Sequence, residues 1–152
     1  MRKFIVSIDA GTTSNRSILF DLKGKPIFSS QREFTQYFPK SGWVEHDPEE
    51  IWRTTVKTLR DVITKAKKLK GKILTIGITN QRETTVLWDK KTGKTIYKAI
   101  VWQDRRQAEY CKKLKKQNKE TIIFNKTGLP IDSYFSGTKI KWILDNVPLA
   151  KK

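Results

Sequence analysis

The sequence predicts an α/β fold built on a mixed β-sheet. Three observations predict it: two apolar segments flank a Gly-Thr-Thr-Ser turn near the amino terminus, a long amphipathic pattern follows Asp47, and residues 73–79 form a nearly continuous β-branched run. Strands joined by a tight turn pair antiparallel, whereas strands of one sheet joined by a helix usually pair parallel. We therefore expect an antiparallel β-meander that is extended by a parallel strand after a crossover helix.

The meander is expected to contain three strands, at residues 4–9, 17–22 and 26–32. A tight Lys-Gly-Lys turn at residues 23–25 joins the second strand to the third. Glycine favours such a turn because it adopts left-handed backbone angles without steric cost. The first and second strands meet at the Gly-Thr-Thr-Ser turn, so two hairpins follow in succession.

A long helix is expected to begin at Asp47, with Asp47 as N-cap and Pro48 in the first turn. Apolar residues then recur at three- and four-residue steps through residues 51–69, so that one stripe packs on the sheet. Gly71 is expected to end the helix, and the strand at 73–79 to be central and buried on both faces. This order of elements is typical of the opening of a ribonuclease-H-like fold.

The second half of the chain predicts shorter elements. Short strands are expected at residues 84–88 and 96–102 around a turn at 90–94, and helices at 105–116, 120–124 and 138–145, with a loop at 127–135. The sequence shows no repeat and no low-complexity linker, and a chain of 152 residues fits one domain.

The net charge of +17 makes nucleic-acid binding an alternative to be weighed. The excess lysines gather at residues 65–72 and 112–119, near the ends of two expected helices, where cations complement the helix macrodipole. They lack the interleaved aromatic residues of single-strand binders. We therefore expect solvated helix ends and no nucleic-acid partner. A non-catalytic basic module that binds nucleic acid or a complementary chain stays as the alternative.

No apolar run reaches the length of about 18 residues that suggests a membrane span, and the single cysteine excludes an intrachain disulfide. We therefore expect a cytoplasmic protein without a membrane partner. Cys111 lies in a lysine-rich segment that could lower its pKa, but we favour a packing role for it. The lone His46 is expected to organise the loop before the long helix.

The turn between the first two strands has the composition of a phosphate-binding site. Gly11 lets a phosphate approach the backbone, and Asp9 supplies a carboxylate for a metal ion or its waters. Hydroxyl groups follow at Thr12, Thr13 and Ser14. Neither the P-loop nor the dinucleotide-binding glycine pattern is present. The residues alone leave two interpretations open, a phosphate cradle and an ordinary hairpin turn.

Polar residues also follow two of the later strands. Arg82 and Glu83 can bind a polyol, because a guanidinium donates hydrogen bonds and a carboxylate accepts hydroxyl protons. A salt-bridged turn is the alternative. Trp102 offers an aromatic wall beside the donors and acceptors of residues 103–106, or else a core side chain.

The whole chain resembles the amino-terminal part of the FGGY family of carbohydrate kinases. The resemblance rests on six segments in the same order: DAGTTSNRS, SQREF, GWVEHDPEEIW, GITNQRETT, AIVWQDRR and DSYFSGTKIKWILD. It implies an actin-like ATPase fold and transfer of the ATP γ-phosphoryl group to glycerol, giving sn-glycerol 3-phosphate. Another sugar kinase of the same family is the nearest alternative.

The resemblance also implies roles for individual residues. Thr12, Thr13 and Ser14 would contact the nucleotide phosphates, Arg16 would lie near the transferred phosphoryl group, and Asp9 would serve Mg²⁺. On the polyol side, Arg82, Glu83 and Tyr134 would hydrogen-bond glycerol and Trp102 would pack on its carbon skeleton.

By the same resemblance, residues 1–152 are the amino-terminal portion of the family's first domain. The rest of that domain, the second domain and the catalytic base would lie outside this chain, and the full-length protein would form a homo-oligomer. We therefore expect the chain alone to bind its ligands weakly at best and not to turn over.

Overall fold

The computed structural model describes residues 1–148 and 150–151, which form two compact units. The sheet unit comprises Met1–Thr35 and Asp47–Gln81, and the helical unit comprises Gln36–His46 and Arg82–Lys152. Both units are discontinuous in sequence, because the segment 36–46 leaves the sheet unit and pairs with a strand of the helical unit. The chain therefore has two compact units where its length suggested one.

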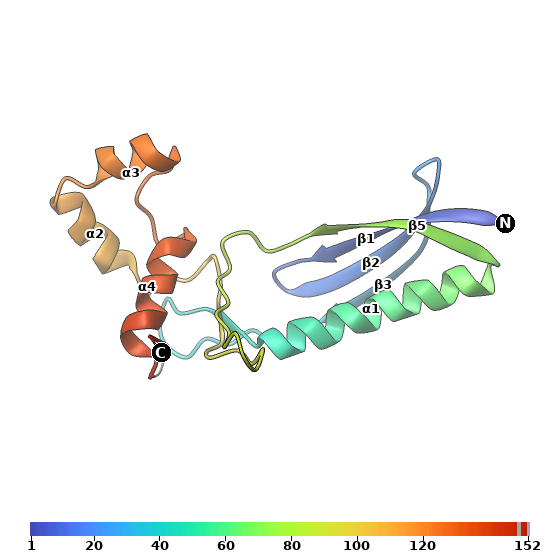
Figure 1. Cartoon of the computed structure of the whole chain (residues 1–152), viewed down its shortest axis with the longest axis horizontal. Coiled ribbons are helices and arrows are strands. Elements are labelled where there is room, and N and C mark those ends of the chain that lie inside the picture. The colour runs from blue at the N-terminus through green and yellow to red at the C-terminus, as the bar shows by residue number, and fades with distance from the viewer. Residues whose placement is uncertain (149, 152) are drawn as a thin grey trace. The chain divides into compact units, whose positions relative to one another are not determined.

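The sheet unit contains a mixed sheet and one long helix (Figure 1). Its elements are β1 (Arg2–Ala10), β2 (Ser14–Asp21), β3 (Pro26–Glu33), α1 (Pro48–Lys68) and β5 (Gly71–Thr79). The strand order is β3-β2-β1-β5; the β1–β2 and β2–β3 pairs are antiparallel, and β1 and β5 are parallel. The predicted meander, crossover helix and parallel strand are confirmed.

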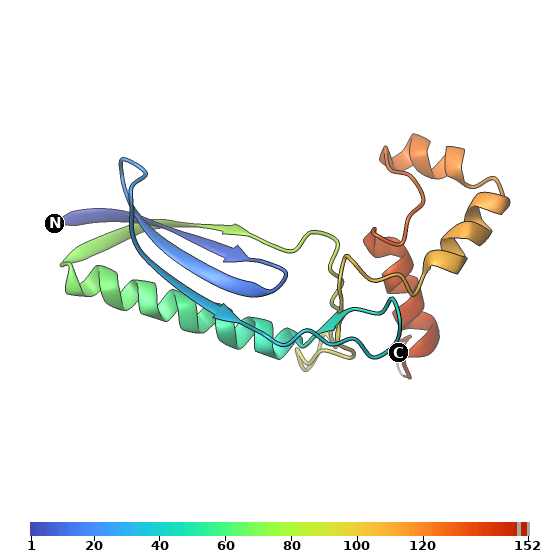
Figure 2. The same ribbon diagram turned by 180° about the vertical axis from the view of Figure 1, so that it is seen from behind.

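The core of the sheet unit lies between the sheet and α1, which runs along one face of the sheet in Figures 1 and 2. Successive side chains of a strand point to opposite faces, so Val6, Ile8 and Leu19 are turned inward together. Val62 and Ala66 of α1 complete the buried cluster. The apolar stripe predicted for this helix therefore packs as expected.

The start of α1 is as predicted, but its end is not. At the start, the Asp47 carboxylate accepts a hydrogen bond from the N–H of Glu49 (2.9 Å). At the end, the residue with left-handed backbone angles is Lys70 (φ 50°), and Gly71 already belongs to β5. Glycine is required at this position for space, because a Cβ atom on Gly71 would lie 2.1 Å from the Phe4 ring.

Gly71→Ala is therefore expected to lower the free energy of unfolding of the sheet unit by about 1–3 kcal/mol, since the added methyl group must displace a buried ring. Gly77→Ala on the same strand is the matched control, because nothing lies within 4 Å of the position that its Cβ atom would take. Urea unfolding followed by circular dichroism measures both variants. Equal stabilities would contradict the close contact between Gly71 and Phe4.

β5 lies at an edge of the sheet, so the prediction of a central strand buried on both faces is wrong. Among the described residues it pairs with β1 alone. Leu74, Ile76 and Ile78 of this strand are 48%, 43% and 73% exposed. The β-branched run predicts a strand correctly, but the number of neighbouring strands is a tertiary property that the run does not contain.

The helical unit contains two short strands and three helices. They are β4 (Glu45–His46), β6 (Ala99–Ile100), α2 (Ala108–Lys116), α3 (Glu120–Thr127) and α4 (Ser136–Asn146). β4 and β6 pair antiparallel, although residues 45–46 were predicted to lie in a loop. The strands predicted at 84–88 and 96–102 are reduced to β6 and isolated bridges, whereas the three predicted helices are confirmed apart from their end residues.

None of the helices that the structure describes combines the length and the apolar character that crossing a membrane requires.

Candidate functional site

The turn between β1 and β2 is the predicted phosphate hairpin. The N–H of Gly11 donates to the carbonyl of Ser14 (3.0 Å), so the chain reverses over Gly11, Thr12 and Thr13. A Cβ atom on Gly11 would lie only 3.0 Å from that same carbonyl oxygen, and the turn therefore favours glycine. Thr13 is exposed at the tip, and the Ser14 hydroxyl accepts a hydrogen bond from the Gln31 amide (2.8 Å).

The base of the hairpin carries an ion pair. Asp9 and Arg16 face each other in the β1–β2 register, and Arg16 Nη2 lies 3.3 Å from Asp9 Oδ2. The side chains of Arg16 and Asp9 are 46% and 43% exposed. An ion pair this exposed contributes at most about 1 kcal/mol to stability, so both groups can turn to a charged ligand at little cost. The hairpin thus places a cation, an anion and several hydroxyl groups at one end of the sheet.

Asn15, for which the sequence predicted no role, anchors this hairpin to α1. Its side chain is fully buried, and its amide donates to the carbonyl of Ile51 (2.9 Å) and to the hydroxyl of Thr54 (2.7 Å). Asn15 lies between Ser14 and Arg16, so these hydrogen bonds fix the backbone beside both candidate phosphate ligands. The alternation of the strand could have indicated this burial, because Asn15 is four residues before Leu19 and therefore points to the same inward face of the sheet.

Glu83 has a strained backbone conformation in the helical unit. Its φ of 66° lies in the left-handed region, which residues other than glycine rarely adopt. Its carboxylate accepts hydrogen bonds from the N–H and from the hydroxyl of Ser136, both at 2.8 Å. Strain of this kind persists only where surrounding contacts enforce it, and such residues cluster at functional sites.

The structure brings Glu83 together with the segment that carries Tyr134, because Ser136 lies two residues further along the same turn. The ring of Tyr134 packs edge-on against Trp102, with centroids 5.9 Å apart. The N–H of Trp102 in turn donates to the hydroxyl of Thr84 (3.3 Å), next to Glu83 in the chain. Three of the four predicted polyol-binding residues therefore belong to one connected group.

The fourth, Arg82, is exposed and directly precedes Glu83. In the described part of the chain, the structure joins it to none of the other three by a hydrogen bond or an ion pair. Its five N–H donors are therefore accessible to solvent.

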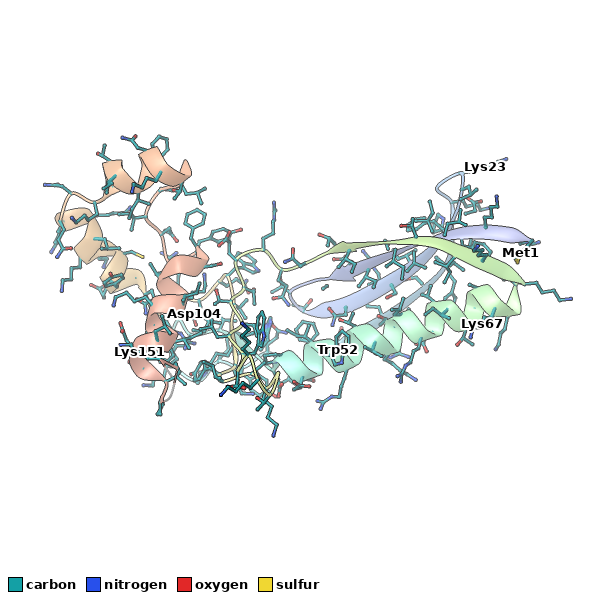
Figure 3. The ribbon with its side chains drawn as sticks, in the orientation of Figure 1. Met1, Lys23, Trp52, Lys67, Asp104 and Lys151 are labelled. Carbon is teal, nitrogen blue, oxygen red and sulfur yellow. The ribbon has the colours of Figure 1, made fainter. Side chains whose placement is uncertain are left out.

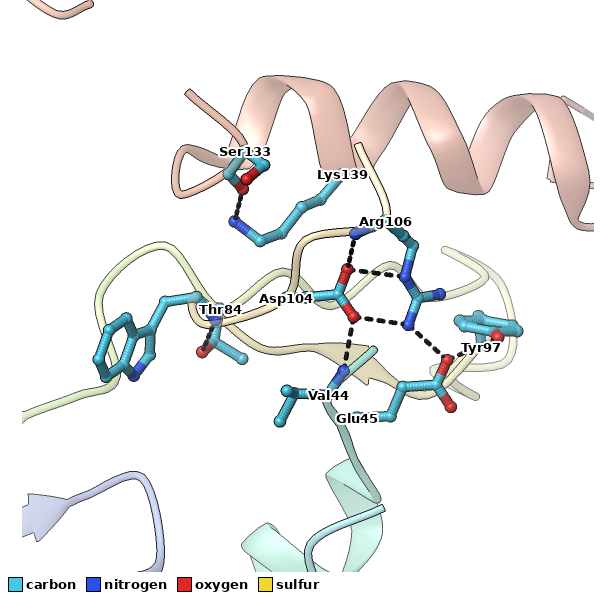
Figure 4. Close-up of polar contacts among 9 residues, drawn as sticks. Val44, Glu45, Thr84, Tyr97, Asp104, Arg106, Ser133 and Lys139 are labelled. Atoms are coloured by element: carbon cyan, nitrogen blue, oxygen red, sulfur yellow. Dashed lines mark hydrogen bonds and ion pairs between the residues drawn. The ribbon is translucent and has the colours of Figure 1, made fainter. Parts of the chain in front are cut away.

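Two charged residues after Trp102 are structural rather than available to a ligand. Asp104 and Arg106 side chains are each 1% exposed, and Figure 3 marks the place of Asp104 in the helical unit. Arg106 donates to both oxygens of Asp104 (2.9 Å each) and to Glu45 (2.7 Å), as Figure 4 shows. Although burial lowers the pKa of Arg106, the hydrogen bonds that its guanidinium donates to Asp104 and Glu45 outweigh this effect and raise the pKa.

Tyr97 joins this network by donating its hydroxyl to Glu45 (2.7 Å), and burial together with that carboxylate raises the pKa of Tyr97. Asp104 also accepts the N–H of Val44 (2.7 Å), which ties the segment 36–46 to the strand that precedes Trp102. The network therefore holds in place the backbone that carries Trp102.

The predictions for Cys111 and His46 are confirmed. Cys111 is 5% exposed, and burial, followed by the charge of Asp132, raises the pKa of its thiol, in keeping with a packing role. His46 is fully buried and its Nε2 lies 2.6 Å from the side-chain oxygen of Gln36. It organises the segment before α1.

A cavity of about 430 Å³ borders Glu83 within the helical unit. Its lining is largely apolar and includes Leu114, Ile123, Leu129 and Phe135. Trp102 and Tyr134 are not among its lining residues, so we place the candidate polyol site at Glu83, Trp102 and Tyr134 and not in this cavity.

The fold gives the class of the protein: the chain has the actin-like ATPase fold of the sugar kinases. It is similar to the glycerol kinase of Plasmodium falciparum solved with ADP, with a TM-score of 0.91 and 37% identity over 99% of this chain and 30% of that one. It is also similar to the xylulose kinase of Rhodospirillum rubrum, with a TM-score of 0.88 over 97% of this chain, although at 24% identity this likeness concerns the fold alone.

Residues 4–152 match the family model described as the FGGY family of carbohydrate kinases, N-terminal domain. The chain belongs to this family. It is 60% identical to the glycerol kinase of Malacoplasma penetrans over 98% of this chain, and 60% identical to that of Oceanobacillus iheyensis over 99%. It spans 29% and 30% of the lengths of these two relatives.

Proposed function

We propose that the chain is the amino-terminal part of an ATP-dependent glycerol kinase, which transfers the γ-phosphoryl group of ATP to glycerol and yields sn-glycerol 3-phosphate. The observation that carries the proposal is the 54–60% identity to glycerol kinases over nearly the whole chain. The two candidate groups of residues support it, since one suits a nucleotide and the other a polyol.

In this proposal the hairpin binds ATP. Thr12, Thr13 and Ser14 hydrogen-bond the phosphates, and Arg16 offsets the negative charge that spreads over the transferred phosphoryl group. Asp9 holds Mg²⁺ directly or through water. A half-exposed carboxylate at a strand end fits this hard cation, which prefers oxygen ligands and keeps several waters. Mg²⁺ held there would supply positive charge to offset that of the nucleotide phosphates.

The second group binds glycerol. Glu83 accepts hydrogen bonds from its hydroxyl groups while Arg82 and the Tyr134 hydroxyl donate, and Trp102 packs on its carbon skeleton. In such a reaction the protein itself performs little covalent chemistry. Its groups contribute mainly by positioning the hydroxyl group for in-line attack and by stabilising the charge of the transition state. We propose that turnover also needs the part of the polypeptide that the relatives have and this chain does not span.

Titration of the ¹⁵N-labelled chain with MgADP and with glycerol tests both halves of the proposal. MgADP is expected to shift the amides of residues 11–16, and glycerol those near Glu83, Trp102 and Tyr134. Asp9→Asn is expected to weaken MgADP binding about tenfold through the lost anionic ligand. Asp145→Asn is the matched control, since Asp145 is also a half-exposed partner of a basic side chain.

Three outcomes would contradict the proposal. Shifts with xylulose or gluconate but not with glycerol would indicate another sugar substrate. Binding of DNA with a steep slope of log K against log salt would favour the basic-module alternative. Phosphorylation of glycerol by the 152-residue chain at more than about 1 s⁻¹, which is within the ordinary range of enzymes, would refute the need for further polypeptide.

A further inference from the structure

Lys139 of α4 is a fully buried residue, with only 1% of its surface exposed. Lysine is almost never buried to this degree unless its ammonium group is paired, because leaving water costs a charged group several kcal/mol. Neither the nucleotide group nor the polyol group described above includes this residue. Its environment therefore requires an explanation.

The hydrogen bonds of the Lys139 ammonium go to three consecutive main-chain carbonyl groups. Nζ donates to the carbonyl oxygens of Ser133 (2.9 Å) and Tyr134, and more distantly to that of Phe135 (3.4 Å). Figure 4 shows the side chain of Lys139 extending from α4 toward Ser133. An ammonium group has three N–H donors, so each can serve one carbonyl of the turn that precedes α4.

This position is unfavourable for a cation. α4 begins at Ser136, so Lys139 lies in its first turn, at the positive end of the helix dipole. Burial lowers the pKa of Lys139 to about 8, even though the negative charges of Glu83, Asp104 and Asp132 favour the protonated form. Because burying this charge is costly, a contribution to stability does not explain why Lys139 is buried.

Lys139 holds the turn that carries Tyr134. The carboxyl-terminal end of this turn is held by Glu83, whose carboxylate accepts hydrogen bonds from Ser136. We propose that Lys139 is a positioning residue for the polyol site: its ammonium group fixes the backbone of residues 133–135, so that the Tyr134 ring stays against Trp102 and its hydroxyl stays in place for the substrate. The polyol part of this inference rests on the proposed function.

The role gives glycerol binding a pH dependence. Above pH 8 the neutral amine keeps two N–H donors and turns a lone pair toward a carbonyl oxygen, so the turn loosens and affinity for glycerol falls. Stability changes in the opposite direction. The folded pKa of Lys139 lies below its ordinary value of 10.5, so the unfolded chain binds more protons between these values and this residue's contribution to stability rises with pH from 8 to 10.5.

The test compares Lys139→Met with Lys141→Met in the whole chain. Lys141 is the matched control, being an exposed lysine on the same helix, paired with Asp145. At pH 7, Lys139→Met is expected to weaken glycerol binding about tenfold, as for loss of one charge-assisted hydrogen bond, and Lys141→Met to leave it unchanged. In the unmodified chain and in Lys141→Met, the amides of Tyr134 and Phe135 are expected to shift with a midpoint near pH 8, and this transition is expected to be absent from Lys139→Met.

Equal glycerol affinity in the two variants would overturn the positioning role. If Lys139→Met does not fold, the pH titration of the unmodified chain decides alone: turn amides without a transition near pH 8, or affinity that does not fall through it, overturn the proposal. If glycerol shifts no amide in any variant, the proposed polyol site is wrong. The pH titration of the Tyr134 and Phe135 amides still decides whether the Lys139 ammonium group fixes this turn.

Discussion

Replacing Arg106 by methionine is expected to lower the free energy of unfolding of the helical unit by about 3–5 kcal/mol, a large part of the roughly 5–15 kcal/mol that stabilises a typical domain. The guanidinium is enclosed by Asp104 and Glu45 and lies 3.8 Å from the centroid of the Trp43 ring and 4.5 Å from that of Trp142. Methionine fills much of the volume but leaves two buried carboxylates without their cation.

Arg105→Met is the matched control, because Arg105 is the adjacent residue of the same type but its side chain is 60% exposed and its pair with Asp132 is long (3.3 Å). It is expected to change stability by less than about 1 kcal/mol. Urea unfolding followed by circular dichroism measures both variants, and tryptophan fluorescence, to which the edge-on pair Trp43 and Trp142 contributes, provides a second signal. Similar losses for both arginine variants would show that the buried network contributes little.

Replacing Glu83 by alanine is expected to have the largest effect on the proposed function, weakening glycerol binding at least about tenfold. The carboxylate is removed as a hydrogen-bond acceptor for the polyol, and the N–H and hydroxyl of Ser136 lose their partner, so the Tyr134 turn is freed at one end. Glu109→Ala, on the exposed surface of α2, provides the control. Titration with glycerol, monitored at the amide of Trp102, measures the effect.

The strained backbone at Glu83 allows a second variant to be compared. Glu83→Gly removes the same carboxylate but also relieves the left-handed conformation, so it is expected to be more stable than Glu83→Ala by about 1–2 kcal/mol. Both variants are expected to bind glycerol equally poorly. A glycine variant no more stable than the alanine variant would show that the turn does not hold Glu83 in this conformation, and tight glycerol binding by either would remove Glu83 from the site.

The elements that the sequence predicted well depend on local signals. Asp47 caps α1 through its own side chain, and Gly11 sits where only a small residue fits the turn. The edge position of β5 could not be predicted, because neighbouring strands are chosen by contacts between segments distant in sequence. The same holds for β4 and β6, where a two-residue pairing carries no periodic pattern.

The candidate polyol-binding residues were named from the sequence, but the residues that hold them in place were not. Glu83, Trp102 and Tyr134 were singled out, whereas the residues that hold them, Lys139 and Arg106, have charges that suggest exposed positions. One signal existed for Lys139: it is four residues before Ile143, and both face the buried side of α4. The backbone strain at Glu83 had no sequence signal, since glutamate is not a typical residue for left-handed angles.

The open edge of β5 has a consequence for how molecules of this chain meet one another. In the described part of the chain one edge of β5 has no partner strand, and Leu74, Ile76 and Ile78 are exposed; such an edge is a template on which a second strand can add, and it promotes aggregation. The net charge of +17 acts against this, because like-charged chains repel before their edges touch. At about 0.15 M salt that repulsion extends only about 8 Å, so the tendency of this chain to self-associate is expected to increase with ionic strength.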